Sequence, residues 1–345
     1  MVLEDVHDRP LLDLRISVTD RCNMRCRYCM PREHFDENHE FLPKEDILRF
    51  EEIVRVVEAL IPHGLRKVRL TGGEPLLRRD LHELVRQLRA SSADLDIAIT
   101  TNGLLLKRQL TKLHEAGLSR ITISLDSLKK EVYQSMGDTD AEPSIVLEAI
   151  DEVQARGIPL KINTVVKKNV NDDQIINMIE TFGPRQIPVR FIEYMDVGTT
   201  NNWNLDHVVS GKVMRSRIEK ELGALQSNQA IHKSDVAKVY TTADGWKIGF
   251  IESITNPFCG DCSRARLSAN GNIYTCLFAN NGHDVRGILR MDGTSDDIKT
   301  ALQSIWKKRK DRYSEERSSL PTKSKVEMSY ICLLYTSDAA DDRIG

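Results

Sequence analysis

Residues 13–31 read DLRISVTDRCNMRCRYCMP, and this segment decides the fold. Its apolar run, 14–18, is a candidate β-strand, and three closely spaced cysteines follow it, namely Cys22, Cys26 and Cys29. In α/β barrels the chemistry lies at the carboxyl ends of the strands. The segment therefore predicts a barrel strand whose end carries a three-thiolate site.

The same pattern continues along the chain. Further apolar runs rich in Val, Ile and Leu are candidate strands at 67–70, 97–100, 120–125, 160–165 and 189–194. Helical spacing of apolar residues is found between them, at 47–61, 81–89, 107–116, 144–156 and 172–182. Alternation of this kind predicts βαβ units and a parallel sheet. Six units favour an α/β fold built as a partial (β/α)6 TIM-type barrel. A doubly wound open sheet stays the alternative.

The pattern changes after Val197. The polar stretch GTTNNWN, 198–204, leads into a less regular region of mixed α+β character. We therefore predict a barrel domain at 1–204 and a C-terminal α+β module at 205–331.

Charge and cysteine content narrow the class of protein. The 49 Lys and Arg residues nearly balance 51 Asp and Glu, which argues against a general nucleic-acid or membrane-surface binder. No apolar run is long enough for a bilayer, and the N-terminus MVLEDVHDRP lacks a secretory pattern, so we expect a cytoplasmic location. Six of the seven cysteines form two groups of three, which favours metal ligands over disulfides.

The first triad offers soft thiolate ligands, which suit an iron–sulfur cluster. Three ligands on a 4Fe–4S cubane leave one iron open for another molecule, whereas a structural metal site normally closes its coordination sphere. The alternative from spacing is a zinc site completed by His34.

A second triad follows in the C-terminal module, with Cys259, Cys262 and Cys276. Its spacing is compatible with a zinc ribbon completed by His283 or with a second 4Fe–4S cluster. Arg264 and Arg266 lie between its members, and an i, i+2 pair on an extended segment points to one side. Guanidinium groups suit phosphate oxygens, so a triphosphate site is a reasonable expectation here.

Two more features lie near predicted strand ends. The motif TGGEP, 71–75, follows the second strand, and its glycines allow close approach of backbone to a ligand. Polar or sulfur-containing residues recur at the later strands, at Thr100, Ser124, Lys161 and Met195. Together they predict a shared pocket mouth.

The segment from Cys22 to Cys29, with the GGEP motif, resembles the signatures of the radical S-adenosylmethionine superfamily. The order of the two triads, with RAR at 264–266, resembles the pattern of the GTP 3′,8-cyclase family, whose members catalyse the first step of molybdenum cofactor biosynthesis. Supporting stretches are VRLTGGEPLLR, RFIEYMDVG, NPFCGDCSRARLSANG and CLFANNGHDVRG. The resemblance covers about 11–331.

The resemblance implies roles for individual residues. Cys22, Cys26 and Cys29 would hold one 4Fe–4S cluster, and Cys259, Cys262 and Cys276 would hold another. S-Adenosylmethionine would contact Tyr28, Gly73, Ser124 and Met195. GTP would contact Arg15, Arg69, Thr100, Lys161, Arg264 and Arg266. The catalytic set would be the first three cysteines with Arg264 and Arg266.

The implied reaction is a lyase reaction that converts GTP to (8S)-3′,8-cyclo-7,8-dihydroguanosine 5′-triphosphate. Cleavage of S-adenosylmethionine would give a 5′-deoxyadenosyl radical that takes hydrogen from C3′ of GTP, and C3′ would then bond to C8. The implied partners are an electron donor, a second copy in a homodimer, and cyclic pyranopterin monophosphate synthase, which takes the product. No nucleic acid or membrane partner is expected.

Two rival functions remain at this stage. A peptide-modifying radical S-adenosylmethionine enzyme with auxiliary clusters is one, although such modules usually carry more cysteines. A zinc-stabilised binding protein without catalysis is the other, and iron analysis would separate it.

The final stretch CLLYTSDAADDRIG, 332–345, does not fit the rest of the chain. It resembles a translation of the mosaic-end sequence of transposon-based library adaptors, so we expect a sequencing-adaptor artefact rather than a lineage-specific extension. Family members end in two glycines near this point, where Cys332 stands here.

A chain that ends Ile331-Gly-Gly is expected to cyclise GTP better than the chain as given, because the family's glycine tail reaches into the active site. An anaerobic cyclisation assay of both chains, matched for iron content, measures the difference. Equal activity would defeat this expectation, and reading genomic DNA past codon 331 tests the artefact itself.

Overall fold

The computed structural model describes residues 2–229, 236–291, 293–317 and 326–327. The predictions about Ile331, Cys332 and the tail 332–345 fall outside the described residues. Within them, one sheet runs in the order β12-β11-β10-β1-β2-β3-β4-β5-β6-β9-β8-β7.

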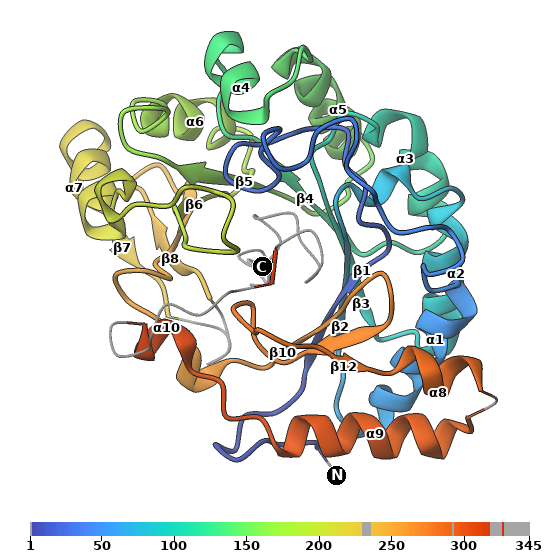
Figure 1. Ribbon diagram of the computed structural model, residues 1–345. Helices are drawn as coiled ribbons and strands as arrows, with labels where there is room; N and C mark the ends of the chain where they lie inside the picture. Colours follow the sequence, from blue (N-terminus) through green and yellow to red (C-terminus); the bar gives the residue numbers. More distant parts are fainter. Residues whose placement is uncertain (1, 230–235, 292, 318–325, 328–345) are drawn as a thin grey trace.

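Six parallel strands form the centre of this sheet in sequence order. They are β1 (Asp13–Ser17), β2 (Lys67–Thr71), β3 (Asp96–Thr101), β4 (Arg120–Ser124), β5 (Leu160–Val166) and β6 (Val189–Glu193). Helices line the outside of the curved sheet (Figure 1): α1 (Phe50–Leu60), α2 (Leu81–Ser91), α3 (Leu106–Glu115), α4 (Lys130–Gly137), α5 (Pro143–Ala155) and α6 (Ile175–Phe182). A doubly wound sheet would reverse its strand order part way. The predicted partial barrel is therefore confirmed, with α4 as an additional helix.

The region after 204 adds strands to the same sheet. On one side β9 (Lys247–Ile251) pairs in parallel with β6, and on the other β10 (Arg264–Leu267) pairs in parallel with β1. Antiparallel edge strands follow, namely β7 (Gln226–Ser227), β8 (Lys238–Thr241), β11 (Asn272–Tyr274) and β12 (His283–Asp284). The helices of this region are α7 (Gly211–Leu222), α8 (Arg286–Arg290), α9 (Ser295–Lys307) and α10 (Tyr313–Glu316). The C-terminal region thus flanks the barrel, and the predicted boundary at 204 stays a prediction.

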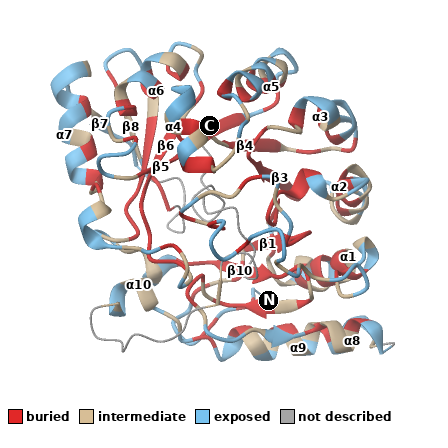
Figure 2. Ribbon diagram, turned by 45° about the horizontal axis from the view of Figure 1, so that its top comes forward, coloured by how far each residue is buried: buried red, intermediate tan, exposed pale blue. Residues whose placement is uncertain are grey.

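The strands alternate between an apolar and a polar face. Leu14 and Val68 belong to the main hydrophobic core together with Val57 of α1. The intervening positions carry Arg15 and Arg69, which are also fully buried. Figure 2, coloured by burial, shows the strands buried inside and the exposed residues on the surrounding helices. Because side chains alternate along a strand, helix packing on one face leaves a polar barrel interior on the other.

Three short 3-10 helices join these elements near the strand ends: Pro75–Leu77 after β2, Leu205–His207 after β6, and Cys259–Asp261 before β10. A fourth, Ile61–His63, extends α1. In the part of the chain that the structure describes, no helix is both long and apolar enough to cross a membrane.

Candidate active site

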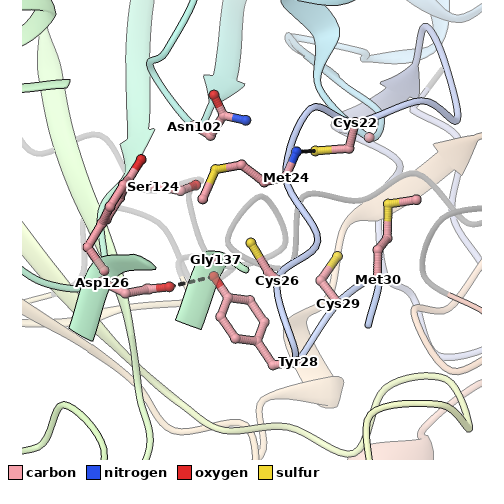
Figure 3. Close-up of a pocket in the computed structure, with 12 residues that line it drawn as sticks. Cys22, Met24, Cys26, Tyr28, Cys29, Met30, Asn102, Ser124, Asp126 and Gly137 are labelled. Atoms are coloured by element: carbon pink, nitrogen blue, oxygen red, sulfur yellow. Dashed lines mark hydrogen bonds between the residues drawn. The ribbon is translucent and has the colours of Figure 1, made fainter. Parts of the chain in front are cut away.

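The first cysteine triad lies in the loop after β1, and its three members line one pocket (Figure 3). Tyr28 from the same loop lines it as well. Gly73, from the turn after β2, and Ser124, at the end of β4, complete this side. The structure therefore brings the first triad together with three of the four residues predicted to contact S-adenosylmethionine.

Hydrogen bonds give the cysteine loop its shape. The Cys26 carbonyl accepts from the backbone N–H of Cys29 and of Met30, both at 2.9 Å. The Arg25 guanidinium donates to the carbonyls of Cys22 at 2.9 Å and Phe35 at 2.8 Å. Because guanidinium donors lie in one rigid plane, these bonds hold the two ends of the loop at a fixed separation. The sulfurs are thus positioned by the protein itself.

Gly73 lies where a side chain cannot fit. A Cβ atom there would be 2.2 Å from the carbonyl oxygen of Arg21. The Gly73 N–H donates to the Thr19 carbonyl at 2.9 Å, and the Glu74 N–H donates to the Arg21 carbonyl at 2.8 Å. The glycine motif therefore packs directly against the segment that leads into Cys22.

Gly73→Ala is expected to lower the free energy of unfolding by about 1–3 kcal/mol, because the added methyl must push the backbone of the cysteine loop away. Urea unfolding of the metal-free chain measures this loss. The matched control is Gly287→Ala in α8, where a Cβ meets nothing closer than 3.8 Å. Equal free energies of unfolding in the two variants would show that the close packing at Gly73 does not contribute to stability.

Burial makes the thiols of the first triad difficult to ionise without a metal. Desolvation, followed by the negative charge of Glu74, raises the pKa of Cys22 to about 12. Desolvation and the neighbouring thiols raise the pKa of Cys26 well above its usual range. A metal deprotonates a coordinating thiol outright and supplies the missing positive charge. Three half-buried thiols around one pocket therefore suit metal-bound thiolates.

Two buried acids in this site escaped the sequence reasoning. The Tyr28 hydroxyl donates to Asp126 at 2.6 Å, and desolvation raises the pKa of Asp126 to about 6. Glu74 accepts from the Thr101 hydroxyl at 2.7 Å and the Asn102 N–H at 2.8 Å, and desolvation raises its pKa to about 7. The available signal for Glu74 was its position directly after the glycine pair. For Asp126 it was the position directly after the predicted strand 120–125.

The second triad borders a pocket of its own with Arg264 and Arg266, and its members are Cys259, Cys262 and Cys276. One Arg264 nitrogen, Nη2, donates to the Cys262 sulfur at 3.3 Å. Burial raises the pKa of Cys262, but the positive charges of Arg264, Arg309 and Arg266 outweigh it and bring the pKa to about 6. Cys262 is thus held near neutral pH as the thiolate, which is the metal-binding form.

A layer of buried arginines lies between strands of the barrel. Arg15 is in register with Arg69 on one side and with Arg266 on the other, and all three are almost wholly buried. In-register residues of parallel strands share a face, so the three guanidiniums lie on the barrel's inner side. Arg69 donates to the hydroxyls of Thr100 at 3.0 Å and Thr122 at 3.3 Å. The structure therefore brings together four of the six residues predicted to contact GTP, counting Thr100.

A fourth buried guanidinium escaped the sequence reasoning. Arg190 of β6 is fully buried and in register with Asn163 and Gly249. A Cβ at Gly249 would be 2.8 Å from Cγ of Arg190, so the glycine leaves room for the arginine chain. The signal was a charged residue inside the apolar run VRFIE.

Lys161 lies in a different part of the barrel from the other residues predicted to contact GTP. It is the second residue of β5, in register with Thr122, and lines a cavity at the amino ends of the strands with Asp96 and Arg120. Because β5 begins at Leu160, Lys161 lies near the amino end of its strand and does not line the pocket of the first triad. Its register still places it on the inner face.

Met195, the fourth residue predicted to contact S-adenosylmethionine, lies apart from the other three. It lines the pocket of the second triad and does not line that of the first. It belongs to an apolar cluster that includes Tyr28 and Tyr194, and Cys26, Cys29 and Cys276 pack against the same cluster. Two cysteines of the first triad and one of the second therefore pack on a shared apolar wall, and Met195 of that wall lines the pocket of the second triad.

The donor sets fit iron–sulfur clusters better than zinc. Among the described residues, no three His, Cys, Asp or Glu side chains converge tightly enough for one metal ion. A 4Fe–4S cubane is larger than an ion, so its cysteine ligands stand farther apart. The all-thiolate composition is also typical of such clusters. His34 does not line the pocket of the first triad, and His283 does not line that of the second.

Two family models and several curated relatives match this chain. The model of the Radical SAM superfamily matches residues 16–182, and that of Molybdenum Cofactor Synthesis C matches 187–315. A GTP 3′,8-cyclase of Staphylococcus epidermidis (strain ATCC 35984) is 44% identical over 336 residues, which are 96% of this chain and 98% of that protein. A GTP 3′,8-cyclase of Staphylococcus aureus (strain JH9) is 42% identical, over 95% of this chain and 98% of that protein.

Among solved structures, Streptococcus suis SuiB bound to S-adenosylmethionine shares the fold, with a TM-score of 0.59 and 15% identity. The match covers 86% of this chain and 69% of SuiB. With relatives above 40% identity over nearly the full length, the chain belongs to the GTP 3′,8-cyclase family of the radical S-adenosylmethionine superfamily.

Proposed function

We propose that this chain catalyses the cyclisation of GTP to (8S)-3′,8-cyclo-7,8-dihydroguanosine 5′-triphosphate, the first step of molybdenum cofactor biosynthesis. One observation supports it most: two cysteine triads flank a barrel interior that carries the buried guanidiniums of Arg15, Arg69, Arg190 and Arg266. An interior of this kind suits a polyanion, because buried cations are expensive unless anions or hydrogen-bond acceptors meet them.

The proposed cofactors are two 4Fe–4S clusters and S-adenosylmethionine. Cys22, Cys26 and Cys29 would hold one cluster, and Cys259, Cys262 and Cys276 the other. Tyr28, Gly73 and Ser124 would contact S-adenosylmethionine, whereas Met195 would reach it across the shared apolar wall. When bound, the first cluster and S-adenosylmethionine supply a 5′-deoxyadenosyl radical that can take a hydrogen atom from carbon.

The chain's own residues would position the substrate. Arg15, Arg69 and Arg266 would meet the triphosphate with forked hydrogen bonds, and burial strengthens each of them because water does not screen the charge. Arg264 would act at the edge of the second pocket, next to Cys262. Fixed contacts at both ends of GTP would present one ribose hydrogen to the first pocket, which supplies the regioselectivity.

The apolar cluster shared by both triads would exclude water from the space between them. A reactive carbon radical needs such a dry site, because side reactions compete with cyclisation. Lys161 would add positive charge from the amino end of the barrel. These roles are proposals for the residues of this chain.

The partners are proposed on the family alone. A separate electron donor would reduce the clusters, a second copy of the chain would complete a homodimer, and cyclic pyranopterin monophosphate synthase would take the product. Size-exclusion chromatography of the anaerobic holoprotein tests the dimer, for which twice the 39.2 kDa chain mass is the expected result.

The proposed function is tested by incubating the reconstituted holoprotein with GTP, S-adenosylmethionine and a reductant without oxygen. With both cubanes full, it should carry about eight irons per chain. The expected product is an isomer of GTP, because one electron and one proton replace the hydrogen atom lost from C3′. Chromatography with mass spectrometry would resolve it from GTP, and unconsumed GTP beside active cleavage of S-adenosylmethionine would contradict the proposal.

A further inference from the structure

Three charged residues distant in sequence meet behind the second cysteine triad. Asp5 and Arg9 come from the N-terminal segment, and Arg309 follows α9. All three are buried, with exposed fractions of 6%, 2% and 4%. Figure 1 shows the N-terminal segment beside α9, and the Trp306 indole N–H donates to the Arg9 carbonyl at 3.0 Å.

The two arginines reach the backbone of every part of the triad. Arg9 donates through Nη1 to the Cys259 carbonyl at 2.9 Å. Arg309 donates through Nη1 to the Cys262 carbonyl at 2.6 Å and through Nε to the Thr275 carbonyl at 3.0 Å. Thr275 immediately precedes Cys276, so all three cysteine-bearing segments are held.

Asp5 joins the two guanidiniums. Its Oδ2 accepts from Arg9 Nε at 2.7 Å and from Arg309 Nη1 at 3.3 Å. The same carboxylate accepts the Arg9 backbone N–H at Oδ1, at 3.1 Å. Arg309 also lies over the Trp306 ring, 4.5 Å from its centre. Rigid donors on both sides of one carboxylate fix the spacing of the segments they hold.

We propose that Asp5, Arg9 and Arg309 form a clamp that positions the three cysteines of the second triad for a single 4Fe–4S cluster. The inference rests on the proposed function, because that function assigns the cluster to this triad. The three are positioning residues that act through the backbone carbonyls of the cysteine-bearing segments.

The charges behind the triad nearly balance. The two guanidiniums meet the Asp5 carboxylate, and the Asp311 carboxylate lies 4.0 Å from Arg309 Nε. Buried ligands of a metal group are commonly oriented by neighbours whose removal weakens metal binding by about 10–100-fold. The clamp therefore acts by holding the cysteine-bearing segments in place rather than by adding positive charge.

Lysine cannot replace Arg309 in this geometry. One ammonium donates as a point charge, whereas the Arg309 fork spans Asp5, the Cys262 carbonyl and the Thr275 carbonyl at once. A clamp that works through geometry therefore predicts cluster retention in the order Arg, then Lys, then Ala. A purely electrostatic effect predicts that Arg and Lys are equal.

The test uses the full chain with Cys22, Cys26 and Cys29 all changed to Ala, so that only the second cluster contributes. After anaerobic reconstitution this background should hold about four irons per chain. In it, Arg309→Lys should release iron to a chelator about tenfold faster, and Arg309→Ala faster still. The electron paramagnetic resonance spectrum of the reduced cluster should shift in both, since its ligands move.

The matched control is Arg89→Lys. Arg89 on α2 also donates to backbone carbonyls, those of Gly117 and Ala93, neither of which belongs to a segment that carries the second triad. Its variant should keep the iron release rate and the spectrum of the background. Should Arg309→Ala fail to fold, Arg309→Lys and Asp5→Asn decide by the same two readouts.

Iron release and a spectrum in Arg309→Lys equal to those of the background would overturn the clamp while leaving the proposed function intact. A background chain that takes up no iron at the second triad would overturn both. The order Arg, Lys, Ala with an unaffected Arg89→Lys supports the clamp.

Discussion

Cys26→Ala is expected to abolish cleavage of S-adenosylmethionine to 5′-deoxyadenosine while the second cluster stays in place. Cys26 borders the pocket that Tyr28, Gly73 and Ser124 also line. A cubane held by three cysteines loses a third of its protein ligands in this variant, with no spare thiol in the loop. Liquid chromatography of 5′-deoxyadenosine, with iron analysis, measures the result.

Iron should fall from about eight to about four per chain in Cys26→Ala. The mirror control is Cys262→Ala, which should retain cleavage of S-adenosylmethionine and lose GTP turnover. Production of 5′-deoxyadenosine by Cys26→Ala at the parental rate would remove the first triad from the chemistry.

Arg266→Ala should lower kcat/KM for GTP about 30-fold or more, because truncating one partner of a buried, hydrogen-bonded charge pair costs about 2 kcal/mol or more. Arg266 is 1% exposed and in register with Arg15, so no water is available to replace the guanidinium. Steady-state kinetics over a range of GTP concentrations measures the effect.

Two comparisons make the Arg266 result specific. Iron content must match the parent, since Arg266 also lowers the pKa of Cys262. Arg185→Ala, which removes a partly exposed arginine bound to Asp151 and Gln154, should leave kcat/KM unchanged. GTP kinetics of Arg266→Ala equal to those of the parent would exclude Arg266 from the substrate site.

Local patterns predicted the barrel well. The six central strands were visible because each is a short run of β-branched and aliphatic residues between turn signals. Helix α4 was not, since KEVYQSMG mixes charged, aromatic and small residues over only two turns. The parallel pairing of β1 with β10 had no local signal either, because it joins residues some 250 positions apart, such as Arg15 and Arg266.

The site was predictable where spacing carries chemistry. The CxxxCxxC spacing marked the first triad and the CxxC pair marked the second, and the structure places each triad in one pocket. Arg190 escaped because a lone charge in an apolar run has no motif, and only the register with Gly249 reveals its place. The clamp escaped for a different reason: its bond from Arg9 to Cys259 spans 250 positions.

Met195 illustrates a further limit. Its sequence position after β6 placed it at a strand end. Which of the two cysteine pockets its side chain lines depends on the loop that follows. That loop is held by Tyr194, whose hydroxyl donates to the Asn201 carbonyl at 2.7 Å. Such tertiary contacts decide which pocket a side chain lines, and spacing alone does not contain them.

The most direct measurement follows the hydrogen atom at C3′ of GTP. The reconstituted chain would be incubated without oxygen with S-adenosylmethionine, a reductant and GTP that carries deuterium at C3′. Our account predicts 5′-deoxyadenosine that is one mass unit heavier and a cyclised product that has lost the label. Unlabelled 5′-deoxyadenosine alone, with the deuterium still in GTP, would contradict it.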